Sequence, residues 1–483
     1  MDATRLFRGM TRTRLTALDS SFLRVETPNA HMHVAWTGVF DPHAARPRPA
    51  LAYLRASVAA RLRHVPRFRQ RLAFPPLGVA EPVWVDDPHF NIDRHVIQLA
   101  SERLSTASFH ERADRLLSTP LDRAHPLWQI ALAPHLADGR VGVVCRIHHA
   151  LVDGKSAVEL ALLLLDAEPN AEPGESDSWA PTPPPGGARM ALDAMVDGAG
   201  EGLRAAGGVA RLARSPRRGA NRIASTLRQT ALAVEADLLR PAPSSFVNAP
   251  IGPRRRLLRA QAPIPRLLAI KEAAGVTLND VCLAAVAGAM RELSLSRREL
   301  PRGLKAMVPV SVRGADERGA LGNRISFAFV ELPAQLRGPA ERLARVHEQT
   351  SGFKRDSRPA GTEMLLGALG ALPSPLKDVA ARAAASPRVY NLTVSNVPGP
   401  RVPVYMLGAE LAEVHPVVPI PEGHALSIGI FTYRDSAFFG LYADPDALPE
   451  VERLPAALSA SILALERAVR EVPAALPSAA GTG

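Results

Sequence analysis

The residues best suited to chemistry lie in one short segment, residues 148–154, which reads His-His-Ala-Leu-Val-Asp-Gly. It follows the apolar run 141–147, which is typical of a β-strand, and precedes residues 156–165, which are typical of a helix. Histidine has an unperturbed pKa of about 6.5, so an imidazole can accept and return a proton near neutral pH. The segment therefore predicts an acid–base site where a strand ends in a turn.

The spacing within this segment predicts a different role for each of its polar residues. His149 is the candidate general base. Asp153 either holds His149 as in a triad or turns away and fixes the loop, and we favour the second because the chain bends at Gly154. On an extended strand neighbouring side chains point to opposite faces, so we expect His148 to support the loop from behind.

The rest of the sequence offers no evident nucleophile to accompany the histidines. It contains no Gly-x-Ser-x-Gly elbow, and its two cysteines, Cys145 and Cys282, lie in apolar runs typical of core positions. A base without a nucleophile predicts direct transfer to a bound substrate, without a covalent enzyme intermediate.

The segment resembles the His-x-x-x-Asp-Gly signature of coenzyme-A-dependent acyltransferases and nonribosomal condensation domains. Six further blocks, in the same order, resemble the bacterial wax ester synthase/diacylglycerol acyltransferase family. They are residues 15–22 with 26–28 and 32–34, residues 120–123 with 126–128, and residues 278–281, 309–313, 322–323 and 395–400. The resemblance covers roughly residues 12 to 470, and only the segment from about 170 to 245 matches no block.

Several of these blocks contain candidate pocket residues. Trp128 either presents its indole to a lipid pocket or is buried beneath a loop. Asn279 or Asp280 is predicted to cap the helix that begins there, and the resemblance implies that Asn279 also borders the active site. Asn396 lies where a strand is predicted to break into a fixed, proline-rich loop or a plain turn.

The resemblance also implies a fold. We expect an α/β protein with mixed sheets, in which a helical crossover joins two chloramphenicol-acetyltransferase-like lobes. The active site would occupy a tunnel between the lobes, a common position for ligand sites. His149 of the first lobe would there face Asn279, Asn323 and Asn396 of the second.

Length and composition agree with two lobes. A chain of 483 residues is too long to fold around a single hydrophobic core of ordinary size. Its hydrophobic content of 47% is sufficient for a sizeable core. We expect an N-terminal lobe at 1–167, a linker with basic helices at 168–245, a C-terminal lobe at 246–472 and a flexible tail at 473–483. Strands are expected at 34–40, 128–132, 141–147, 304–310, 325–332, 392–395, 426–433 and 438–442, and helices at 50–63, 105–117 and 451–472.

Charge is concentrated in one part of the chain. The net charge is +11, and residues 188–260 hold thirteen arginines against five acidic residues. Their helical, partly apolar pattern predicts either a membrane or lipid-droplet contact or a crossover packed on the second lobe with solvated arginines. Nucleic acid is disfavoured because aromatic residues are 5% of the chain and no nucleic-acid module is present.

Composition also predicts the compartment. Two cysteines fit a reducing environment, and the N-terminus lacks the apolar stretch of a signal peptide. The longest apolar runs, such as 281–290, are about half of a membrane span. We therefore expect a cytoplasmic protein that attaches peripherally to the inner membrane or to lipid droplets.

The histidine segment and the family resemblance together imply an O-acyltransferase with acyl-CoA as a substrate, no cofactor and no metal. The acceptor would be diacylglycerol or a long-chain alcohol. Arg254, Arg255 and Arg256 either meet the phosphates of coenzyme A or form a solvated cluster or membrane contact. The alternatives are a condensation-like acyltransferase with a carrier-bound donor, and a non-catalytic lipid-droplet protein.

Overall fold

The computed structural model describes residues 14–42, 49–76, 80–151, 164–169, 179–193, 196, 241–311, 325–355 and 374–471. The strands are β1 (His33–Asp41), β2 (Gln70–Ala73), β3 (Val83–Asp86), β4 (Val96–Gln98), β5 (Trp128–Ala133), β6 (Val141–His148), β7 (Arg256–Pro263), β8 (Leu304–Ser311), β9 (Ile325–Leu332), β10 (Leu392–Pro398), β11 (Tyr405–Met406), β12 (Ala409–Val417), β13 (Leu426–Tyr433) and β14 (Ser436–Ala443). The α-helices are α1 (Ala17–Val25), α2 (Leu51–Arg61), α3 (Ile92–His95), α4 (Thr106–Leu117), α8 (Ile264–Ala274), α9 (Leu278–Ser296), α10 (Pro339–Arg355), α12 (Ser374–Ala384) and α13 (Leu454–Glu471).

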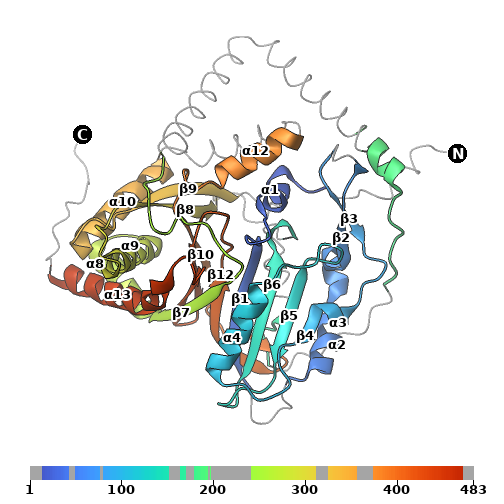
Figure 1. The fold of residues 1–483 in the computed structure, drawn as a ribbon. Coiled ribbons are helices and arrows are strands. Elements are labelled where there is room, and N and C mark those ends of the chain that lie inside the picture. Colours follow the sequence, from blue (N-terminus) through green and yellow to red (C-terminus); the bar gives the residue numbers. More distant parts are fainter. Residues whose placement is uncertain are drawn as a thin grey trace, which may run out of the picture.

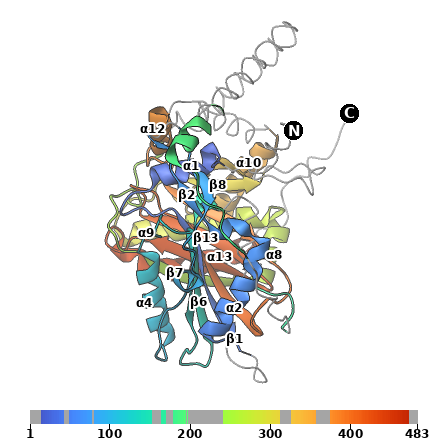
Figure 2. The same ribbon diagram turned by 90° about the vertical axis from the view of Figure 1, so that its right-hand side faces the viewer.

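Two lobes lie side by side, each built on a six-stranded mixed sheet (Figure 1). The first sheet has the order β11-β12-β1-β6-β5-β4, and the second has the order β7-β14-β13-β10-β8-β9. Helices α8, α9, α10 and α13 pack together on the second lobe. In Figure 2, turned by 90° from Figure 1, the first lobe lies in front of the second. The expectation of two mixed α/β lobes is confirmed.

The first sheet is buried on both faces, and this explains its sequence. Every residue of β6 is buried, so the strand is an unbroken apolar run and not an alternating one. One face, which carries Trp128, packs on α2, and the other packs against the second lobe in a core that both lobes share. Because β6 ends at this core, Ala150 and Leu151, which follow it, are buried in the same cluster.

The two sheets do not follow the order of the chain. β11 and β12 come from the C-terminal half, yet β12 pairs with β1 of the first sheet from Ala35–Val417 to Asp41–Glu410. β12 then passes so close to β14 that a Cβ on Gly440 would lie 1.7 Å from the backbone oxygen of Pro416. Only glycine fits this crossing, which ties the lobes together through the backbone.

Most of the expected elements are confirmed within a few residues, because long apolar patterns were clear in the sequence. β9 and β13 coincide with their expected ranges, and α13 begins at Leu454 after a 3-10 turn, Pro449–Arg453. β10 runs on to Pro398, so the expected strand break at Asn396 was placed too early. Much of the predicted linker (168–245), the helix after the histidines and the C-terminal tail fall outside the described residues, although residues 187–193 are helical.

Candidate active site

The two histidines of the motif lie at a change of backbone structure. His148 is the last residue of β6, and His149 begins the 3-10 turn η4 (His149–Leu151). The backbone N–H of His149 donates to the carbonyl of Met32 at 2.8 Å, just before β1. The side chains are therefore separated by the turn, and not by the strand alternation that the sequence suggested.

His149 is held in a largely apolar environment. Its ring stacks on Phe22 of α1 with centroids 3.7 Å apart and planes 12° apart. Its Nδ1 is buried and has no hydrogen-bond partner among the described residues. Burial, which outweighs an interaction with the residue's own backbone, lowers the pKa of His149 to about 4. The ring is thus neutral at pH 7 and able to accept a proton.

His148 contacts the turn on one side and an acidic residue on the other. Its Nδ1 accepts a hydrogen bond from the backbone N–H of Ala150 at 3.0 Å. Its Nε2 lies 3.4 Å from Oε2 of Glu26. The side chain is 1% exposed, so both contacts form inside the protein.

Glu26 is the acidic centre of this group. Arg123 donates to its Oε2 from Nε at 3.1 Å and also from Nη2, and the N–H of Met32 approaches its Oε1 at 3.4 Å. Burial opposes ionisation, but interactions with His148 and then with Arg123 outweigh it and lower the pKa of Glu26 to about 2. The carboxylate is therefore charged at every physiological pH.

His33 extends the group across the sheet. It lies opposite His148 in the β1–β6 register, and its Nε2 accepts from the N–H of Leu121 at 3.3 Å. Burial, followed by the electrostatic interaction with the His148 ring, holds the pKa of His33 well below its usual value. We call Glu26, His33, Arg123, His148 and His149 the histidine network.

Three members of the histidine network were not identified as site residues from the sequence, although all three lie in segments that resemble the family. Glu26, His33 and Arg123 all lie in the blocks quoted for the family resemblance. Those blocks were used only to recognise the family, because nothing in linear spacing shows that residues about 100 positions apart meet. The structure shows that two of the blocks converge on the histidine motif.

On the second lobe two of the expected pocket residues meet. Nδ2 of Asn396 in β10 donates to Oδ1 of Asn279 in α9 at 3.2 Å. Both side chains are half-buried. Asn323, the third expected amide, lies outside the described residues, as do Asp153 and Gly154; their expected roles stay predictions.

Asp280 is engaged by the fold. The residue that caps α9 is Thr277, so the expectation that Asn279 or Asp280 is the N-cap was wrong. Asp280 completes a capping box with Thr277, accepts from Thr350 Oγ1 at 2.7 Å and contacts His347 Nδ1 at 2.8 Å. These contacts lower its pKa against the effect of burial, and its carboxylate has little capacity left for a substrate.

Trp128 is a core residue. It is 1% exposed, its Nε1 donates to the carbonyl of Phe68 at 2.7 Å, and its ring stacks on His95. Of the two possibilities open from the sequence, burial describes its position. The reason is that Trp128 is the first residue of β5 in the first sheet. Its indole N–H is already hydrogen-bonded inside the core, so burial there leaves no polar group unsatisfied.

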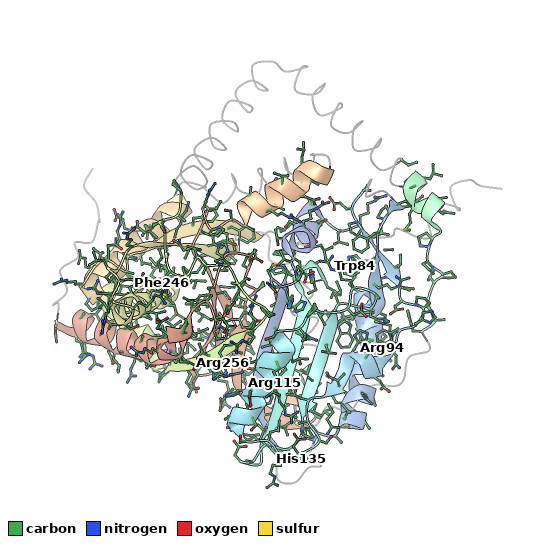
Figure 3. The ribbon with its side chains drawn as sticks, viewed as in Figure 1. Trp84, Arg94, Arg115, His135, Phe246 and Arg256 are labelled. Carbon is green, nitrogen blue, oxygen red and sulfur yellow. The ribbon has the colours of Figure 1, made fainter. Side chains whose placement is uncertain are left out.

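The three consecutive arginines pair with acidic residues of the chain. Arg254 pairs with Asp446, the 3%-exposed Arg255 lies 3.6 Å from Asp444, and Arg256 pairs with Glu452 at 2.9 Å. Figure 3 shows Arg256 low on the boundary between the lobes, near Arg115 of α4. These pairs leave less charge for a phosphate than the sequence suggested.

The described residues outline one hollow away from the histidine network. Its volume is about 360 Å³, and it lies on the second lobe around Phe246, Ser294 and Arg302. Figure 3 labels Phe246 on that lobe. Within the described part of the chain, no group of three histidine, cysteine or acidic residues is placed to hold a metal ion. No single described helix has the length and apolarity to cross a bilayer, whereas α8 and α9, bent by 102°, pass that test as a pair.

Comparisons with known proteins show the family of the chain. The profile of the wax ester synthase/diacylglycerol acyltransferase catalytic domain matches residues 15–282, and that of the C-terminal domain of the same family matches residues 321–466. Two relatives in Mycobacterium tuberculosis are named probable diacylglycerol O-acyltransferases. One, tgs2, is 33% identical over 93% of this chain and 98% of its own length, and the other, tgs1, is 32% identical over 91% and 93%.

Solved structures show the same fold. A wax ester synthase/diacylglycerol acyltransferase from Marinobacter aquaeolei superposes with a TM-score of 0.67 and 24% identity, over 95% of this chain and all of that one. The first condensation domain of the calcium-dependent antibiotic synthetase superposes with a TM-score of 0.58 and 18% identity, over 96% and 97%.

Two lobes, each built on a six-stranded mixed sheet, make up the fold that the condensation domain also has. The expected fold class is thereby confirmed. The chain belongs to the wax ester synthase/diacylglycerol acyltransferase family, and the expectation that it is an acyltransferase is confirmed.

Proposed function

We propose that the protein transfers a long-chain acyl group from acyl-CoA to the hydroxyl of diacylglycerol, of a long-chain alcohol or of both. His149 acts as the general base, and no covalent acyl-enzyme forms. The observation that carries the proposal is the His149 ring, which is half-buried and stacks on Phe22, while the backbone N–H of the same residue donates to the carbonyl of Met32. Desolvation lowers the pKa of the ring to about 4, so the ring is neutral at pH 7. The names of the mycobacterial relatives support the lipid acceptor.

The proposed reaction needs one proton carrier. His149 removes the hydroxyl proton of the acceptor while its oxygen forms a bond to the thioester carbonyl carbon. When the tetrahedral intermediate collapses, the carbon–sulfur bond breaks and the imidazolium returns the proton to the leaving thiolate. The negative charge that develops beside the ring raises the proton affinity of His149 during this step. The hydrogen-bonded Asn279–Asn396 pair would line the acceptor side.

The test uses the purified full-length protein with labelled palmitoyl-CoA and a panel of acceptors that includes dioleoylglycerol and hexadecanol. We expect ester and free coenzyme A from the wild type and almost no ester from His149→Ala. Mass spectrometry of the enzyme after incubation with palmitoyl-CoA alone is expected to show no acyl adduct. Full transfer by His149→Ala or a stable adduct on the wild type would contradict the proposed mechanism.

A second candidate takes its donor from a carrier protein. The similarity in fold to a condensation domain favours it, because such a site could accept the same acyl group from a pantetheine arm. Palmitoyl-CoA and a palmitoylated carrier protein are therefore compared as donors at equal concentration. Turnover with the carrier-bound donor alone would replace the first proposal.

The location of the reaction is also a proposal. An enzyme whose acceptor and product are neutral lipids is expected to work at the inner-membrane or lipid-droplet surface, and the arginine-rich segment 188–260 would favour anionic headgroups. Co-sedimentation with vesicles of neutral and of anionic phospholipid tests this. Equal, negligible binding to both would contradict it.

A further inference from the structure

We propose that Glu26 is a positioning residue for the candidate base: it fixes the tautomer of His148 and, through His148, the turn that carries His149. The inference rests on the proposed function of His149. Glu26 belongs to a different segment from the histidine motif, at the end of α1, and it does not contact the His149 ring in the described hydrogen bonds and ion pairs.

The first step of the argument is the direction of one hydrogen bond. The backbone N–H of Ala150 can only donate, so Nδ1 of His148 must accept. A neutral imidazole that accepts at Nδ1 carries its hydrogen on Nε2. The geometry of the turn therefore requires the Nε2–H tautomer of His148.

The second step is what lies beside Nε2. The ring is 1% exposed, so water cannot readily receive this hydrogen. Nε2 makes no hydrogen bond among the described residues. The nearby carboxylate oxygen that could accept one is Oε2 of Glu26 at 3.4 Å, which is longer than the usual distance of about 2.9 Å. Such contacts often shorten when a substrate closes the site. Without the carboxylate, the Nε2–H tautomer would have a buried donor and no acceptor, at a cost of about 1–3 kcal/mol.

The third step is why Glu26 itself stays in place. Arg123 holds the carboxylate from the solvent side, and the N–H of Met32 approaches it from the backbone. Met32 also accepts the hydrogen bond from the N–H of His149. Glu26 thus braces both ends of the turn, through His148 on one side and through Met32 on the other.

The chain provides a matched control in Glu81. Its side chain is 13% exposed, against 10% for Glu26, and it also pairs with cations, Arg24 and Lys377. Its carboxylate accepts hydrogen bonds from Ser20, Arg24 and Lys377, and none of these residues belongs to the histidine network. Glu81→Gln therefore removes a similarly buried charge without changing the acceptor of His148.

The first experiment measures the tautomer directly in the wild type labelled with ¹⁵N-histidine, with His148 assigned by comparison with His148→Asn. We expect the ¹⁵N shifts of an Nε2–H imidazole in the wild type and in Glu81→Gln. Glu26→Gln is expected to shift His148 toward the Nδ1–H tautomer, because a carboxamide can also donate to Nε2. An Nδ1–H tautomer in the wild type, or unchanged shifts in Glu26→Gln, would overturn the proposal.

The second experiment is a double-mutant cycle on acyl transfer. Glu26→Gln is expected to lower kcat by about 10- to 100-fold, as a displaced base does, with the KM for acyl-CoA within about twofold. In His148→Asn the carboxamide oxygen can accept from Ala150 with no tautomer to choose, so adding Glu26→Gln should change kcat less than about twofold. The same loss in both backgrounds, or an equal loss in Glu81→Gln, would overturn the proposal.

The two experiments separate this inference from the function on which it rests. If the wild type transfers no acyl group to any acceptor, the proposed function fails while the ¹⁵N shifts still report the tautomer. If the wild type is active and His149→Ala is inactive, but Glu26→Gln matches the wild type in kcat, the proposed function stands and the positioning role of Glu26 is refuted.

Discussion

The two lobes hold their candidate site residues by different physical means. In the first lobe, the histidine network combines a carboxylate, an arginine and three imidazoles from three separate segments. In the second lobe, Asn279 and Asn396 are neutral amides that contact each other. Their neighbour Asp280 is taken up by the capping box of α9 and by α10.

The difference suggests separate roles for the two lobes in proton transfer and in substrate binding. In the proposed reaction, proton transfer needs a group whose charge can change. The first lobe supplies the half-buried imidazole of His149, next to His148, which faces the Glu26–Arg123 ion pair. Binding of an uncharged lipid needs shape and a few neutral hydrogen bonds, which amides on a capped helix provide. The first lobe should therefore control the chemical step, and the second should mainly control binding.

Loss of activity is the largest effect that this comparison predicts. His149→Ala is expected to lower kcat/KM by about 10²–10⁴-fold, the usual contribution of a general base. Asn396→Ala removes one neutral hydrogen bond and is expected to cost about tenfold. Steady-state kinetics measure both losses, and the melting temperatures of the two variants should equal that of the wild type, as a control for folding. Similar losses in the two variants would break the proposed division between the lobes.

In the second lobe, loss of the buried Asp280 charge, which connects α9 to α10, should lower the free energy of unfolding. Asp280→Asn keeps the shape of the side chain but weakens its contacts with His347 and Thr350, at an expected cost of about 1–3 kcal/mol in unfolding free energy. Asp446→Asn, at an exposed pair with Arg254, should cost less than about 0.5 kcal/mol. Urea denaturation measures both, and equal costs would contradict the structural role of Asp280.

The pH dependence of activity should report the protonation of His149 in the first lobe. Because burial lowers the pKa of His149 to about 4, the unprotonated base persists as pH falls, and the acidic limb of kcat/KM is expected near pH 4 and not near 6.5. Asn396→Ala should leave this limb in place.

The pH experiment needs a check on folding. A buried histidine with a lowered pKa takes up a proton on unfolding, so its contribution to stability falls as pH drops from about 6.5 toward the folded value. Tryptophan fluorescence at each pH shows where the protein is still folded. A limb at pH 6–7 in folded protein would contradict the assignment of His149.

The smallest predicted effect concerns the N-cap of α9, which lies next to Asn279 in the chain. Thr277→Ala removes the N-cap of α9 and should cost about 1 kcal/mol in unfolding free energy, with little change in kcat. Chemical denaturation and steady-state kinetics test the two parts. A large fall in kcat would show that the cap also positions Asn279 for the reaction.

Sequence patterns predicted well where the signal is local. The apolar run before His148 gave β6, and the pattern at 105–117 gave α4, with Ser105 as its N-cap. The pattern failed at Asp280, because a capping box places its acidic residue three positions after the true cap. Trp128 could not be settled from the sequence, because a large aromatic residue after a proline fits both a pocket and a core.

The sequence by itself determined the family, the order of the blocks and the identity of the candidate base. Those features depend on residue types at short spacing, and the local strand-to-turn pattern carries them. Tertiary structure alone brought Glu26, His33 and Arg123 to His148, and added β12 of the second half to the sheet of the first. Such contacts depend on burial and on strand pairing between segments far apart in the chain, and linear order does not encode either directly.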